Sequence, residues 1–274
     1  MKAMKLGLRA LFPVLLFAMF VSNAVPLWAA EPDNEELAKA AQNPVANLVS
    51  VPFQNNINFN VGPQGGVQNI LNIQPVIPFE LSSDWNLITR TIMPVISQPP
   101  FAPGQDTQFG LGDTQLSLFL SPAKKADGFI WGVGMIAQIP THTDSRLGSN
   151  LWGLGPSIVG LRIDGPWVYG ALINNLWSLG GNGSSAYNNF LLQPFVNYNF
   201  GKTGTYLTSS PILTANWKTG DWIVPLGGGI GQIFHMFGKL PVNASLQSYY
   251  NIAHPEGLGP EWQIRFQVQF LFPK

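Results

Sequence analysis

Apolar and polar side chains alternate through the C-terminal residues 262–272, and this pattern constrains the fold more than any other part of the chain. The apolar positions are Trp262, Ile264, Phe266, Val268, Phe270 and Phe272, the polar positions are Gln263, Arg265, Gln267 and Gln269, and Leu271 is the exception. A period of two places the two sets on opposite faces of a β-strand. A half-buried strand of a soluble β-sandwich has the same period. A bulky aromatic face opposite an amide-rich face favours a strand between lipid and a wet lumen, and about 10 residues let a tilted strand cross a bilayer.

The composition supports a membrane protein. Only 10% of the 274 residues are charged, against roughly 25% in an ordinary soluble protein, and the mean hydropathy is +0.13. The formal net charge is zero, so no basic surface for nucleic acid is indicated. The chain contains no cysteine, which removes disulfides and thiolate chemistry from consideration.

Residues 1–30 are predicted to be a secretory signal peptide. Three basic residues before position 10 precede an apolar run at 10–21, and small residues follow at 22–24 and again at 29–30, so two cleavage positions remain open. The alternative is an N-terminal membrane anchor, for which the apolar run is short. The rest of the chain lacks an uncharged apolar stretch of the roughly 18 residues that a spanning helix needs.

The acidic segment 31–44 has two interpretations. Asp33 or Asn34 could cap a short helix with Glu35 and Glu36 in its first turn, where the helix dipole favours negative charge. A disordered leader fits the composition equally well.

Residues 45–274 are predicted to form an antiparallel outer-membrane β-barrel. They divide into about twelve segments with strand periodicity, an even number within the range of such barrels. Long connections are expected at 97–108, 140–150, 180–188 and 253–260, and these would lie on the extracellular side if both chain ends are periplasmic. Four of the other connections depart from a strict alternation of short and long loops.

Tryptophans fall near the ends of the predicted strands, which suits the two aromatic belts of a membrane barrel. Those expected at the periplasmic rim are Trp85, Trp131 and Trp167. Those expected at the outer rim are Trp152, Trp177, Trp217, Trp222 and Trp262.

Charged and amide side chains within the strands are the candidate functional residues. The candidate lumen-lining positions are Glu80, Arg90, Asp113, Gln193, Asn197, Gln263, Arg265, Gln267 and Gln269. On the lipid face a mid-depth arginine costs about 2–4 kcal/mol, so the charges are expected in the lumen or at the rims. They would form either a selectivity ring or a salt-bridged lattice, and we favour the lattice. Arg162 shares the parity of lipid-facing neighbours, which predicts either a bulge at Gly160 or a side chain that extends to the rim.

Catalytic and metal-binding patterns are weak. The sequence around Ser157 lacks the spacing of a nucleophile elbow. His142 with Asp144 is too small a set for a metal site and fits a solvated loop better. A barrel phospholipase needs a Ser–His pair, and no histidine falls in the middle of a predicted strand. We therefore expect no catalytic residue, cofactor or metal.

Several stretches also resemble a known family. They are SVPFQNN (50–56), WNLITRTIMPV (85–95), GLGDTQLSLFLSP (110–122), WGVG (131–134), GPWVYGALINNLWS (165–178), LLQPFVNYNF (191–200) and the C-terminal GPEWQIRFQVQFLFPK. They are similar to bacterial outer-membrane proteins grouped as transporters of the phenol meta-degradation pathway, some of which carry the misleading name neuromedin U. The resemblance implies a barrel that transports small compounds, aromatic ones among them, and it brings no catalytic motif.

The sequence thus predicts a channel in the bacterial outer membrane for small, uncharged or weakly polar solutes. Its expected partners are the lipid bilayer, the barrel-assembly machinery through the C-terminal strand, and the solutes, with no nucleic acid. The alternatives are a structural or adhesion barrel with an occluded lumen, and a barrel enzyme that acts on lipid.

Overall fold

The computed structural model describes residues 33–124, 127–181 and 186–273. The predicted signal peptide, residues 1–30, lies outside the described residues. No helix in these three ranges is long and apolar enough to cross a membrane. The barrel and its N-terminal helix belong to one unit, residues 32–272.

Fifteen strand segments form a single antiparallel sheet. They are β1 (Val49–Val61), β2 (Gly66–Ile73), β3 (Val76–Glu80), β4 (Trp85–Gln98), β5 (Gln108–Leu111), β6 (Thr114–Pro122), β7 (Phe129–Ile139), β8 (Gly153–Asp164), β9 (Trp167–Ser178), β10 (Asn188–Asn199), β11 (Thr205–Ser209), β12 (Leu213–Asn216), β13 (Asp221–Met236), β14 (Leu240–Ala253) and β15 (Trp262–Phe272). Three of the wall strands are each divided in two by a short interruption. Their two parts are β2 and β3, β5 and β6, and β11 and β12. The wall therefore has twelve strands, as the sequence predicts.

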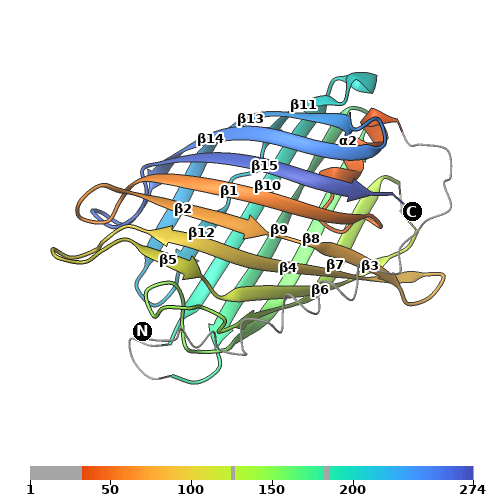
Figure 1. Cartoon of the computed structure of the whole chain (residues 1–274). Coiled ribbons are helices and arrows are strands. Elements are labelled where there is room, and N and C mark those ends of the chain that lie inside the picture. The colour runs from red at the N-terminus through yellow and green to blue at the C-terminus, as the bar shows by residue number, and fades with distance from the viewer. Residues whose placement is uncertain (1–32, 125–126, 182–185, 274) are drawn as a thin grey trace, which may run out of the picture. The chain divides into compact units, whose positions relative to one another are not determined.

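The sheet closes on itself, and the first and last strands are neighbours in it. Strand β1 pairs with β15 from Val49↔Phe272 to Phe59↔Trp262, and Figure 1 shows the strands lying side by side around the barrel. Closure joins the first and last wall strands, so neither of them is a free sheet edge.

Alternation along each strand sets the two faces of the wall. On β15, Phe266 is 48% exposed on the outer face, whereas Arg265 is 2% exposed on the inner face. The strand β1 follows the same rule, with Ser50, Gln54 and Asn56 buried inside. The predicted assignment of faces is correct for these strands.

The connections and tryptophans define the two ends of the barrel. The two-residue turn between β8 and β9 begins with Gly165 at φ 53°, a conformation that two-residue hairpin turns require at their first central position. This turn lies at the end that also holds the C-terminus of β15, which we name the α2 end; the opposite end, with the connections 99–107, 140–152 and 254–261, is the long-loop end. Exposed tryptophans occur near both ends, including Trp85 and Trp167 at the α2 end and Trp177 and Trp262 at the long-loop end.

The acidic segment forms helix α2 (Asn34–Ala41), whose first turn is capped by Asp33: its Oδ1 accepts a hydrogen bond from Glu36 N at 2.9 Å. Leu37 and Ala38 are buried against inward-facing side chains of the wall, among them Leu271. The chain then continues across the lumen, where Val45 packs in a second apolar cluster that includes Ile88, Phe119, Val159 and Phe195. Residues 33–48, which we name the plug, therefore fill the α2 end of the barrel.

Arg162 lies on the outer face near the α2 end. Its pairing with Phe129 belongs to a register without a shift through Gly160, so the bulge at Gly160 is absent, and Arg162 is exposed two residues before the end of β8.

Candidate solute passage

The outer cavity has a volume of about 780 Å³ and is larger than the inner chamber described below. It lies toward the long-loop end, and its polar lining comes mainly from amides. The lining includes Asn56, Asn58, Gln68, Asn72, Gln98, Gln108, Asn251 and Gln263, together with Arg146 and Arg265. Asp221, at the exposed start of β13, is its one carboxylate among the described residues.

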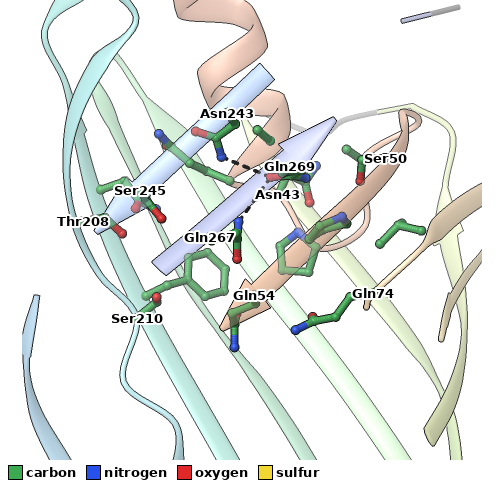
Figure 2. Close-up of a pocket in the computed structure, with 18 of the residues that line it drawn as sticks. Asn43, Ser50, Gln54, Gln74, Thr208, Ser210, Asn243, Ser245, Gln267 and Gln269 are labelled. Atoms are coloured by element: carbon green, nitrogen blue, oxygen red, sulfur yellow. Dashed lines mark hydrogen bonds between the residues drawn. The ribbon is translucent and has the colours of Figure 1, made fainter. Parts of the chain in front are cut away.

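The inner chamber lies between the outer cavity and the plug and has a volume of about 140 Å³. Figure 2 shows polar side chains from several strands converging on it beneath the helix. The lining includes Gln54, Gln74, Gln193, Asn197, Ser245, Gln247, Gln267 and Gln269, with Arg90 as the only charged side chain among the described residues. Asn243 Nδ2 donates to Gln269 Oε1 at 3.1 Å, which fixes one wall of the chamber.

Arg265 separates the two spaces. Its Nη1 donates to the carbonyl oxygen of Ser210 at 2.8 Å, and Ser210 lines the inner chamber while Arg265 lines the outer cavity. Nε donates to Asn56 Oδ1 at 3.1 Å and Nη2 to Gln263 Oε1 at 3.3 Å. The guanidinium carbon also lies 4.9 Å from the ring centroid of Tyr249, within the range of a cation–π interaction.

The sequence explains why the carbonyl of Ser210 is free to accept this bond. Pro211 has no N–H and cannot donate to the sheet, so the wall strand is interrupted between β11 and β12. The backbone N–H of Ser210 also leaves the ladder and donates to Tyr249 Oη at 3.1 Å.

Arg90 projects into the inner chamber from β4. Its Nη2 donates to Gln74 Oε1 at 2.6 Å, the only hydrogen bond of this side chain to a described residue. Neither Arg90 nor Arg265 forms an ion pair within residues 33–124, 127–181 and 186–273. The predicted salt-bridged lattice is therefore absent at these two positions, because no carboxylate lies within reach of either side chain.

Two candidate residues lie outside both cavities. Glu80 is exposed at the last position of β3, so it belongs to the rim of the α2 end and not to the lumen wall. Asp113 lies between β5 and β6 and holds the loop 140–150: it accepts bonds from Ser149 N at 2.6 Å, Gln138 Nε2 at 3.0 Å and the ring of His142 at 2.6 Å. His142 thus pairs with Asp113 and not with Asp144.

Arg146, on the same loop, is a lining residue that the sequence did not indicate. Its Nε donates to Asp144 Oδ1 at 3.2 Å and its Nη1 to the carbonyl oxygen of Asp106 at 3.3 Å, while Nη2 bonds to Gln108. The bond from the backbone N–H of Arg146 lowers the pKa of Asp144, and the guanidinium adds to this effect. Loop residues carry no strand periodicity, so their position over the lumen could not be read from the pattern.

The described residues contain no cluster of three or more His, Cys, Asp or Glu side chains that could hold a metal ion. His235 lies at the end of β13 and His254 in a loop. No serine–histidine hydrogen bond occurs among the described residues.

The closed antiparallel wall, with apolar side chains outside and amides inside, defines a β-barrel of the outer-membrane type. Comparison with solved structures agrees: a COG4313 outer membrane channel from Pseudomonas putida F1 superimposes with a TM-score of 0.60 over 82% of this chain and 94% of that one, at 16% identity. Outer membrane phospholipase A from Escherichia coli gives 0.43, at 12% identity over 89% and 99% of the two chains. LpxR from Salmonella typhimurium gives 0.37, at 10% identity over 81% and 100%.

No family model matches the sequence, and no curated protein matches it. At such low identity the likeness to the channel establishes the fold alone. The phospholipase and LpxR superimpose too poorly to bear on the function.

Proposed function

We propose that this chain is a bacterial outer-membrane channel for small, uncharged or weakly polar solutes. The observation that carries the proposal is the pair of amide-lined cavities, which together extend from the long-loop end to the plug. Twelve strands lie between the eight-stranded barrels that side chains fill and the 16–18-stranded barrels that hold open water channels, so the passage is narrow. The sequence resemblance adds aromatic compounds to the solutes worth testing.

In this proposal the exposed apolar side chains of the wall face the lipid of the outer membrane. The α2 end is periplasmic and the long-loop end extracellular, and the C-terminal strand is the part that the barrel-assembly machinery recognises. The chain acts without a catalytic residue or a cofactor.

Solute-dependent swelling of liposomes tests the proposal directly. Vesicles that contain the purified, refolded protein should swell in small amides and alcohols at rates that fall steeply with solute size. Because the plug closes one end of the passage, a plug-loosened variant, Leu37→Glu, should swell faster. Swelling no faster than in protein-free vesicles, for both proteins, would refute the channel.

The second candidate is a structural barrel whose lumen stays occluded. The plug and the bond between Arg265 and Ser210 favour it, since they interrupt the passage at two levels. Single-channel recordings in planar bilayers separate the candidates, because an occluded barrel gives no discrete openings.

A further inference from the structure

The charges inside the lumen indicate which small solutes the passage prefers. We infer that Arg265 and Arg90 are two successive binding positions for the carboxylate group of a small organic acid. The inference rests on the proposed channel and adds to its uncharged or weakly polar solutes those that join one carboxylate to a weakly polar body.

The first position is Arg265, a buried cation whose acceptors are all neutral. Its partners are the carbonyl and hydroxyl oxygens of Ser210 and the side-chain amides of Asn56 and Gln263. A buried charge without a counter-charge is costly. The guanidinium already makes charge-assisted bonds to its neutral acceptors, and a carboxylate adds a counter-charge and can accept two parallel bonds from it. We therefore expect an entering carboxylate to replace Ser210 and Gln263 as the hydrogen-bond acceptor of Arg265.

This exchange would also open the way inward. The bond from Arg265 to Ser210 joins β15 to the interrupted strand between β11 and β12 and separates the two cavities. Gln54 lines both cavities, so an amide is in place for a solute at the boundary. An anionic solute would thus release the contact that blocks its own path.

The second position is Arg90 in the inner chamber. A guanidinium has five N–H donors, and among the described residues Arg90 uses one, toward Gln74. The remaining donors lie in a chamber with no described carboxylate and with amide side chains around it. A chamber of about 140 Å³ accommodates a small organic molecule, since engineered cavities of about 150 Å³ bind benzene.

The two positions are distinct along the wall. Through the pairings Arg90↔Val76, Val76↔Ser50 and Ser50↔Leu271, Arg90 is in register with Leu271, which is six residues along β15 from Arg265. Two separated cations, each of moderate strength, allow an anion to enter and to leave again, as selective pores require.

Other charges near the passage do not cancel this preference. Asp144 at the mouth is bonded to Arg146, and Asp221 is exposed at the start of β13. Between Arg265 and the plug, the described residues that line the inner chamber include no acidic side chain. The field along the inner part of the lumen is therefore positive, and clefts lined by one sign of charge concentrate the opposite ion.

Three probes that share a carbon chain test the inference: butanoate, butanamide and butylammonium. Flux into liposomes is measured for the native chain and for Arg90→Gln, Arg265→Gln and the double variant. Arg162→Gln, which removes an arginine from the outer face near the α2 end, is the matched control. Heat-modifiable mobility confirms that each variant has assembled, and Arg265→Lys tests whether the charge alone suffices.

We expect butanoate to cross about tenfold faster than butylammonium, in line with the strength of hydrogen bonds to charged groups. Each Arg→Gln change should reduce this ratio, the double variant should abolish it, and Arg162→Gln should leave it unchanged. The inference would be overturned by equal flux of butanoate and butylammonium, or by a butanoate-to-butylammonium ratio that stays the same in the double variant. In either case, flux of butanamide would still support the channel. Absence of butanamide flux, also after Leu37→Glu, would instead overturn the proposed channel.

Discussion

Gln42 and Asn199 are joined through both halves of their side-chain amides. Gln42 Nε2 donates to Asn199 Oδ1 at 2.9 Å, and Asn199 Nδ2 donates to Gln42 Oε1 at 3.2 Å. Asn199 Nδ2 also donates to the carbonyl oxygen of Pro166 at 2.9 Å. The pair connects the end of helix α2 to the turn between β8 and β9 and so fixes the plug to the wall.

Breaking this amide pair should loosen the plug without unfolding the barrel. We expect Gln42→Ala and Asn199→Ala each to raise the frequency of channel opening in planar bilayers. In a double-mutant cycle on the free energy of channel opening, the two substitutions should show a coupling energy of about 1 kcal/mol, the usual net value of such hydrogen bonds. Asn189→Ala, at an exposed site on the same strand β10, is the control, and additive effects of the two substitutions would contradict the direct contact.

Leu271 is 0% exposed and packs with the plug, whereas its neighbour Phe272 faces outward. Leu271→Ala should therefore leave a cavity and cost about 2–5 kcal/mol in the free energy of unfolding, the range for buried leucines. Phe272→Ala removes a side chain from the outer surface, so its effect should be smaller. Denaturant titration in lipid vesicles measures both, and the opposite order would mean that Leu271 does not anchor the plug.

Phe266 and Gln267 are adjacent in sequence and lie on opposite faces of β15. Phe266→Arg should cost about 2–4 kcal/mol near the bilayer midplane and impair assembly. Gln267→Arg should assemble normally, because Gln267 lines the inner chamber. The measurements are heat-modifiable mobility and the yield of membrane-inserted protein. Equal yields of the two variants would show that the outer face of this strand is not in lipid.

Acid should loosen the loop that carries Arg146. The pKa of Asp144 is lowered from 3.8, first by the backbone N–H of Arg146 and then by its side chain. A carboxyl group whose pKa is lowered in the folded state stabilises the folded loop at pH values above its unfolded-state pKa. This contribution is lost as the pH falls through its folded-state pKa. Hydrogen exchange of the Arg146 amide, corrected for intrinsic rates, should lose protection below about pH 4. In Asp144→Asn this dependence should disappear.

Strand periodicity was sufficient to predict the barrel, the number of wall strands and the two faces of β1 and β15. It was insufficient where the lumen is filled by protein. If every inward-facing side chain were assumed to be polar, Ile88, Phe119 and Val159 would be assigned to the wrong face. They face inward and pack against Val45. Leu271 breaks the alternation of the last strand for the same reason, since it faces the plug and not water.

The candidate site was predicted less completely, because its contacts connect segments distant in sequence. Arg265 and Arg90 were identified as inward-facing, but the absence of a carboxylate near either depends on how twelve strands are arranged. Glu80 has the inward parity, yet its place at the end of β3 puts it at the rim. Asp113 falls in an interruption between two strand segments, where parity has no meaning.

The pairing of β1 with β15 also has a consequence for how the barrel forms. These strands are separated by almost the whole sequence, so the ring cannot close until the last residues have been made and have found the first strand. Contacts between such distant segments slow folding. A chain that ends before Trp262 would expose free edges on both β1 and β14, and exposed edges invite pairing between molecules. Closure of the ring must therefore follow the synthesis of β15, and until then β1 and β14 need to be kept from pairing with other molecules.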